Sequence, residues 1–341
     1  MRRFLAAAAL VALLAGCSAP VAAPTSAPVP SQEPLAELDL AADPRAVDGP
    51  STAVLASEAV EVIDPPAVPA GLGDDPRVLG LDIAGTIAGT IAGLGLSDLL
   101  VGRDTSTTFP GSEALPLVTS GGHTINAEAV LALRPTLIIT DGTIGPRDVI
   151  EQLGEAGIDV VFLDNEPSFA GAGRLAQDVA AALGDPAAGE RLAAQIASSV
   201  EAKIAEIAQI APPEGSRVRI LFLYLRGGSG IYYLFGKESG ADELIRGLSA
   251  VDVAGEIGWD GMKPMTDEAL IAANPDLILV MTDGLESAGG VDGLLASKPA
   301  LALTAAGQHR RFVDMADGVV LGFGPRSAAV LDALARAVYA P

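Results

Sequence analysis

The segment Glu-Ala-Val-Leu-Ala-Leu-Arg-Pro-Thr-Leu-Ile-Ile, residues 128–139, decides how this chain should fold. It predicts a short helix from about Asn126, a proline, and a buried strand over 136–140. The segment Glu-Ala-Leu-Ile-Ala-Ala-Asn-Pro-Asp-Leu-Ile-Leu, residues 268–279, repeats this pattern. Thr-Asp-Gly follows the first copy directly and the second after a two-residue insertion. A unit that recurs at a spacing near half the mature chain predicts two similar lobes. Two lobes imply a cleft between them, and a cleft implies a ligand.

Strand and helix signals alternate around both copies, which indicates an α/β fold with mostly parallel sheets in each lobe. We predict a first lobe over 76–167, a helical segment over 168–215 and a second lobe over 216–341. The last helix of the middle segment should begin after Asp185 and end before Pro212-Pro213. About 24 helical residues would span roughly 36 Å, enough to connect the lobes.

The remaining elements follow from short apolar runs and their stop signals. The predicted strands are 77–81, 99–103, 158–163, 217–225, 231–235 and 311–315, and the predicted helices are 85–95, 148–156, 239–248 and 327–339. The glycine-rich run 85–95 lacks the Lys-Ser/Thr of a phosphate-binding loop, so a tightly packed helix is the better interpretation.

The N-terminus carries the features of an exported protein. Residues 1–16 combine Arg2-Arg3 with an apolar run too short to span a bilayer, which predicts a signal peptide. Leu-Ala-Gly-Cys, ending at Cys17, is the lipobox of bacterial lipoproteins; the alternative is an ordinary signal with a chance cysteine. Residues 17–75 are rich in Pro, Ala and acids, with Arg45 as the only base, and predict a lipidated, disordered tether.

Composition excludes several classes of function. The net charge is −22, with 43 acidic and 21 basic residues, which argues against nucleic acid and against anionic lipid as partners. One cysteine permits no intrachain disulfide, and two histidines make a multi-His zinc site improbable. Since no hydrolase, Walker or other catalytic motif is present, we expect a binding protein and not an enzyme.

Two residues could hold a metal-bearing ligand. His123 follows Gly121-Gly122, and glycines let the backbone approach a flat ligand closely. Tyr224 lies at the end of an apolar strand with Arg226 two residues on, on the same strand face. A nearby cation favours phenolate, a donor suited to ferric iron, and tyrosine is a known axial haem ligand. The alternatives are a surface-loop histidine and a tyrosine packed on the core.

The pair is more informative than either residue alone, because one candidate stands in each lobe and an iron porphyrin takes axial donors from opposite faces. The carboxyl ends of strands, where Tyr224 lies, are the usual ligand sites of α/β sheets. Arg226 or Arg326 could meet propionates. Further candidate lining residues are the aromatic and methionine side chains Phe109, Tyr232, Tyr233, Trp259, Met262, Met265 and Met281.

The lipobox, the repeated Glu…Pro-x-Leu-Ile unit and the long helix resemble the ABC-transporter binding proteins that take siderophores, cobalamin and haem, which have the class III periplasmic-binding-protein fold. Within that cluster, residues 120–124 (Ser-Gly-Gly-His-Thr) and 222–227 (Phe-Leu-Tyr-Leu-Arg-Gly) resemble the haemin-binding lipoproteins of the HmuT type. The resemblance covers about 77–341. It implies His123 and Tyr224 as iron ligands, with Arg226 beside the tyrosine.

The resemblance also implies partners and a location. Binding proteins of this cluster present one acid per lobe to their permease; Glu128 matches in the first lobe, and Asp252 or Glu256 in the second. We therefore expect a protein that captures ferric haem for an ABC permease and ATPase. Other surface haem-binding proteins are candidate partners, but the sequence does not identify the haem donor. Its lipid would anchor it to the outer face of the cytoplasmic membrane. The alternatives are a siderophore or cobalamin receptor, a surface enzyme and an adhesin.

Overall fold

The computed structural model describes residues 33–57, 59–63, 72–225 and 232–341, and Glu33–Pro341 forms one compact unit. Cys17 and Arg226 lie outside the described residues. In the part of the chain that is described, no helix has both the length and the apolar character needed to cross a membrane. We use first lobe and second lobe for the predicted ranges 76–167 and 216–341, whose boundaries stay predictions.

The first lobe is built on a three-stranded parallel sheet with β5 in the centre. Its strands are β2 (Val78–Leu81), β5 (Leu137–Thr140) and β6 (Asp159–Phe162), and its helices are α1 (Thr86–Gly93), α2 (Ala127–Leu133) and α3 (Arg147–Glu155). The expected strand over 99–103 is wrong: a 3₁₀ turn at Ser97–Leu99 precedes two isolated bridges, Val78 to Leu100 and Arg103 to Leu117.

The second lobe is built on a seven-stranded mixed sheet in the order β1-β12-β11-β7-β8-β10, with β9 also paired to β7. The edge strand β1 comes from residues 51–52, outside the range of this lobe. The strands β8 and β10 are antiparallel to their neighbours, and the other pairs are parallel. The strands are β1 (Ser51–Thr52), β7 (Arg219–Leu225), β8 (Tyr232–Phe235), β9 (Val251–Asp252), β10 (Met262–Pro264), β11 (Leu277–Met281) and β12 (Phe312–Met315).

The remaining helices follow the first lobe along the chain, beginning with α4 and the long α5. They are α4 (Phe169–Ala182), α5 (Pro186–Ile210), α6 (Ala241–Gly247), α7 (Val253–Glu256), α8 (Asp267–Ala273), α9 (Thr282–Ser287), α10 (Gly290–Ser297), α11 (Pro299–Ala302), α12 (Ala305–Gln308), α13 (Asp317–Val320) and α14 (Ser327–Tyr339).

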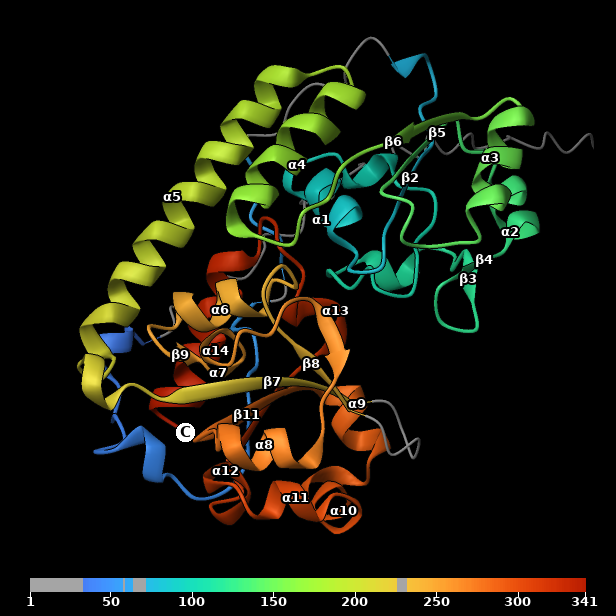
Figure 1. The fold of residues 1–341 in the computed structure, drawn as a ribbon. Helices are drawn as coiled ribbons and strands as arrows, with labels where there is room; N and C mark the ends of the chain where they lie inside the picture. Colours follow the sequence, from blue (N-terminus) through green and yellow to red (C-terminus); the bar gives the residue numbers. More distant parts are fainter. Residues whose placement is uncertain (1–32, 58, 64–71, 226–231) are drawn as a thin grey trace, which may run out of the picture. The chain divides into compact units, whose positions relative to one another are not determined.

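The long helix forms as its caps predict. The Asp185 carboxylate accepts a hydrogen bond from the Ala188 backbone N–H, and Pro186 occupies the first helical position. Its 25 residues correspond to about 37 Å. One stripe of α5, including Leu192 and Ile207, is buried against α4 and α14. Along the chain this helix (lime green in Figure 1) lies between α4 and β7.

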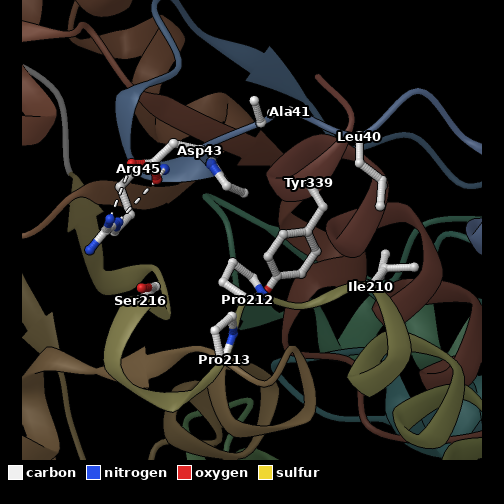
Figure 2. Close-up of a pocket in the computed structure, with 11 residues that line it drawn as sticks. Leu40, Ala41, Asp43, Arg45, Ile210, Pro212, Pro213, Ser216 and Tyr339 are labelled. Carbon is white, nitrogen blue, oxygen red and sulfur yellow. Dashed lines mark hydrogen bonds and ion pairs between the residues drawn. The ribbon is translucent and has the colours of Figure 1, made fainter.

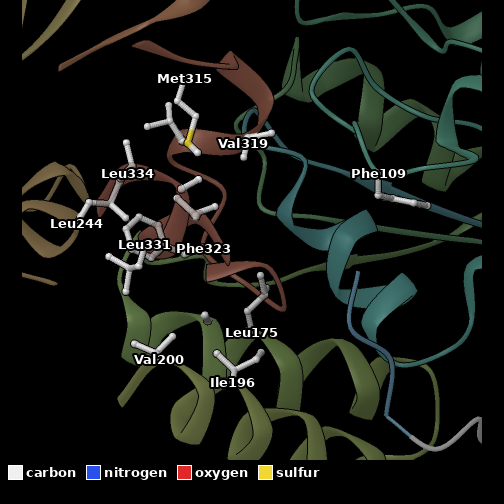
Figure 3. Close-up of a cluster of buried hydrophobic side chains, with 14 of the residues drawn as sticks. Phe109, Leu175, Ile196, Val200, Leu244, Met315, Val319, Phe323, Leu331 and Leu334 are labelled. Atoms are coloured by element: carbon white, nitrogen blue, oxygen red, sulfur yellow. The ribbon is translucent and has the colours of Figure 1, made fainter. Parts of the chain in front are cut away.

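Residues from both lobes share one hydrophobic core. Ile91 on α1 and Ile139 on β5 belong to the same buried cluster as Leu279 on β11 and Leu334 on α14. Figure 3 shows α4, α5 and the second-lobe residues Leu331 and Phe323 meeting in this cluster. Burying a leucine completely is worth about 1.5–3 kcal/mol, so the shared core ties the lobes together strongly.

The predicted tether is wrong for much of its length. Residues 33–57 and 59–63, which we call the N-terminal strap, pack on the folded body. Leu35 is fully buried, and the 3₁₀ turn that carries it contacts α5. The strand β1 extends the second-lobe sheet, with Ser51 opposite Val313 and Thr52 opposite Asp314. Further along, the Ile63 N–H donates to the Gly93 carbonyl at 3.1 Å, so the strap reaches both lobes.

The strap also contacts a buried cation. Arg311 has no exposed surface, and its guanidinium donates to the Ser51 hydroxyl at 2.9 Å. It also donates to the carbonyls of Ala337 and Val338, in the last turn of helix α14. Burial lowers the pKa of Arg311 to about 10, still well above neutral pH, and an unsatisfied buried donor costs about 1–3 kcal/mol. The strap supplies one of the partners that this charge requires.

Candidate ligand-binding site

A tight hairpin presents His123. The strands β3 (Thr119–Ser120) and β4 (Thr124–Ile125) flank Gly121 and Gly122, whose positive φ angles of 58° and 94° suit glycine. The Thr105 hydroxyl donates to the Gly122 carbonyl at 2.7 Å and holds the turn. The His123 side chain is exposed, so its imidazole is available to a ligand at this edge of the first lobe.

Tyr224 is the sixth residue of β7 and is half-buried. It lies opposite Tyr233 of β8, and the two ring centroids are 6.4 Å apart. The Phe235 ring stands edge-on to the Tyr224 ring, with centroids 5.9 Å apart. Arg226 lies outside the described residues, so its contact with the phenol stays a prediction. Tyr232 is placed only by its backbone, opposite Leu225.

The other lining candidates divide into two groups. Phe109 is 6% exposed and Met265 7%, so both are core residues with little surface for a ligand. Met281 is half-buried and packs on the core. In contrast, Met262 is 51% exposed on β10, and Trp259 is half-buried, with an indole Nε1–H that has no partner within the described residues.

Arg326 lies where the lobes touch. Its guanidinium donates to the Thr108 carbonyl of the first lobe at 3.3 Å, and the Thr108 hydroxyl donates to the Gly318 carbonyl of the second. The structure therefore brings Arg326 beside the Thr108–Phe109 segment, whereas no contact joins His123 to Tyr224 among the described residues.

The two second-lobe acids predicted as permease contacts, Asp252 and Glu256, both accept hydrogen bonds within the protein. The Asp252 carboxylate caps α7, accepting from the backbone N–H groups of Ala254 and Gly255 at 3.1 and 3.0 Å. Burial raises its pKa. Glu256 accepts two hydrogen bonds from Arg219, at 2.7 and 3.2 Å. Glu128, by comparison, is exposed in the first turn of α2.

Sequence reasoning missed Glu268, although the repeat pointed to it. Asn126 caps α2 and Thr266 caps α8 by accepting from the N–H three residues on. Both helices end in a residue with a left-handed φ, 48° and 41°, and lead through a proline into a buried strand. Glu268 is exposed in the first turn of α8. It is thus the structural counterpart of Glu128.

A buried polar cluster at the carboxyl ends of the first-lobe strands was also missed. Asp82 follows β2, is fully buried, and accepts from the backbone N–H groups of Thr86 and Ile87 at the start of α1. Its own N–H donates to the Asp104 carboxylate at 3.2 Å. Burial, and then the charge of Asp104, raise the pKa of Asp82 to about 7. An acid directly after the apolar run 78–81 was the available signal.

The described residues line a cavity that touches neither His123 nor Tyr224. A cavity of about 340 Å³ lies between the strap, the end of α5 and Tyr339, as Figure 2 shows, and Asp43 and Arg45 pair at its rim. The described residues contain no group of three or more His, Cys, Asp or Glu placed to hold a bare metal ion. The residue types at His123 and Tyr224 instead suit a ligand that carries its own metal.

Comparison with known proteins identifies the scaffold. The crystal structure of heme binding protein HmuT matches with a TM-score of 0.79 and 38% identity, over 88% of this chain and all of that one. The periplasmic heme-binding protein RhuT from Roseiflexus sp. RS-1, in apo form, matches with a TM-score of 0.71 and 36% identity, over 78% of this chain and 99% of that one.

A lipoprotein of Bacillus subtilis (strain 168) is similar in sequence. The uncharacterized ABC transporter substrate-binding lipoprotein YvrC is 27% identical over 250 residues, which are 72% of this chain and 75% of that protein. A family profile described as periplasmic binding protein matches residues 83–318. With its α/β fold and two copies of the helix–proline–strand unit, the chain belongs to the periplasmic binding protein family.

Proposed function

We propose that this protein binds haem and delivers it to an ABC-type importer. The observation that carries the proposal is the exposed His123 at the edge of one lobe together with the half-buried Tyr224 at a strand end of the other. The 38% identity to a heme binding protein supports the ligand. Crystal structures of HmuT variants in which a tyrosine or an arginine is alanine also match, and those two positions are two apart, as Tyr224 and Arg226 are here.

Each residue has a separate role in this proposal. His123 would donate its imidazole nitrogen to one face of the ferric iron, and Tyr224 its phenolate oxygen to the other. Arg226 would favour the ionised phenol, since a nearby cation stabilises an anion. The iron and the porphyrin arrive with the cargo. The protein contributes the two donors and the apolar surroundings, for which the exposed Met262 is one candidate.

Haem titration of the purified protein tests the ligand assignment. We expect haemin to give a saturable change in the Soret and charge-transfer bands. His123→Ala and Tyr224→Phe should each change the spectrum and weaken binding at least tenfold, about 1.4 kcal/mol. The control is His309→Ala, which removes the other histidine, one that pairs with Asp48 on the strap. Spectra unaltered in both site variants would contradict the assignment, and tighter binding of a ferric siderophore or cobalamin would favour the alternative cargo.

Glu128 and Glu268 are the proposed permease contacts. They occupy equivalent places in the two copies of the repeated unit and are both exposed, whereas Asp252 and Glu256 already satisfy backbone N–H groups and Arg219. Two like charges, one in each lobe, suit two arginines on a pseudo-symmetric membrane partner. Glu268 thus takes the place of Asp252 or Glu256 as the proposed second-lobe contact.

The proposed location rests on the lipobox and on the lipoprotein relative. Cys17 would carry the lipid and hold the protein at the outer face of the cytoplasmic membrane. Metabolic labelling with an alkyne fatty acid, compared between the native chain and Cys17→Ser, tests this anchor. Label retained in Cys17→Ser would exclude Cys17 as the acceptor.

A further inference from the structure

One face of the β7–β8 pair carries four aromatic rings in a chain that is only 4% aromatic. Tyr224 lies opposite Tyr233 in this antiparallel pair. Phe222 is two residues before Tyr224 and Phe235 two residues after Tyr233, so all four side chains share that face of the sheet. The scarcity of aromatic residues elsewhere makes this cluster, residues 222, 224, 233 and 235, a feature to be explained.

Phe235 is the centre of the cluster. Its ring centroid lies 5.0 Å from that of Phe222, with a tilt of 38° between the rings. On its other side it lies 5.9 Å from the Tyr224 ring at 83°, an edge-to-face arrangement. Since Phe222 is fully buried in the core, Phe235 links the half-buried tyrosine to a fixed wall.

The backbone around Phe235 leaves it little freedom. The strand β8 lies between β7 and β10, with Phe235 opposite Met262. The next residue, Gly236, has its Cα against the chain at Trp259: an added Cβ would be 2.2 Å from the Trp259 carbonyl oxygen. The Gly236 N–H also donates to the Gly261 carbonyl at 2.9 Å. Phe235 is therefore held by hydrogen bonds and close packing on both sides.

We infer that Phe235 is a positioning residue that fixes the ring of Tyr224 so that its phenol oxygen is presented in one orientation. An edge-to-face partner restricts rotation of the tyrosine ring, and an axial ligand held in place loses less freedom on binding iron. The inference rests on the proposed function for its use in haem binding. The restriction of the Tyr224 ring itself can be measured without ligand.

The first experiment measures ring mobility in the haem-free protein. The chain has four tyrosines, so 3-fluorotyrosine labelling gives four ¹⁹F resonances, and loss of one in Tyr224→Phe assigns the site. We expect Phe235→Leu to shift and narrow the Tyr224 resonance, and Phe235→Tyr, which keeps a ring, to restore most of the native position. The matched control is Phe169→Leu, because Phe169 forms an edge-to-face pair with Phe323, at 5.3 Å and 65°. A Tyr224 resonance equal in native and Phe235→Leu protein would overturn the inference.

The second experiment measures haem dissociation into excess apomyoglobin. Loss of one edge-to-face contact should speed release from Phe235→Leu about three- to tenfold, with a weaker charge-transfer band, whereas Phe169→Leu should leave both unchanged at a similar loss of thermal stability. If native protein binds no haem, the proposed function fails while the fluorine result still decides the positioning. If native protein binds haem and Phe235→Leu releases it at the native rate, the positioning role is refuted.

Discussion

The N-terminal strap makes a stability prediction that a disordered tether would not. Leu35 has no exposed surface and packs in the main core beside α5. Replacing a buried leucine by alanine typically costs about 2–5 kcal/mol, from lost burial and the cavity left behind. The loss of unfolding free energy cannot exceed the free energy with which the strap docks, because once the strap detaches, residue 35 no longer contributes to the core. We expect Leu35→Ala to lower the free energy of unfolding by at least about 2 kcal/mol.

Urea unfolding followed by the fluorescence of the single tryptophan, Trp259, measures this loss in the second lobe. The control is Val54→Ala, on the same strap but 66% exposed, for which we expect a change below about 0.5 kcal/mol. Ser51→Ala provides a second probe, since it leaves a buried Arg311 N–H without its acceptor, at about 1–3 kcal/mol. A value for Leu35→Ala as small as that for Val54→Ala would refute the docking of the strap in solution.

Three further predictions address other parts of the molecule. The pKa of Asp82 is raised from 3.8 to about 7, so its contribution to stability is full below about pH 4 and is lost as the pH rises through 7; urea midpoints across this range should fall, and less steeply in Asp104→Asn. Glu128→Lys and Glu268→Lys should each abolish stimulation of the importer's ATPase while haem affinity stays within about twofold; stimulation that survives both changes would exclude this pair. Gly93→Val should lower the melting temperature through overpacking of about 1–3 kcal/mol, because a Cβ at Gly93 would lie 2.5 Å from a proline ring of the second lobe; an unchanged melting temperature would show that the contact is loose.

Features that depend on neighbouring residues could be predicted from the sequence. Asn126 and Asp185 cap their helices as their types and positions indicate. The terminal helix was predicted at the bounds that α14 has, Ser327–Tyr339. In each case the stabilising contacts lie within one or two turns of the signal, so a local pattern contains them.

Features that depend on distant partners could not be predicted. The strap shows no hydrophobic period, and the residues that hold it lie far along the chain, such as Arg311, whose guanidinium donates to Ser51 260 residues away. The buried Asp82 is stabilised by backbone N–H groups of the following turn, whereas its neighbour Asp104 comes from a separate loop. Glu268 is a different case, because the repeat aligns it with Glu128 and the signal is therefore present in the sequence.

The connections between the lobes limit how the cargo can be released. Besides α5, the lobes share the buried cluster that contains Ile91 and Leu334, and the strap joins them again where Ile63 bonds to Gly93. A wide opening would have to break these contacts together and expose apolar core, at several kcal/mol in all. Small movements at the site edges are cheaper, for instance at the exposed hairpin of His123. We therefore expect a permease that grips both lobes to release haem by withdrawing an axial ligand, with the core left intact.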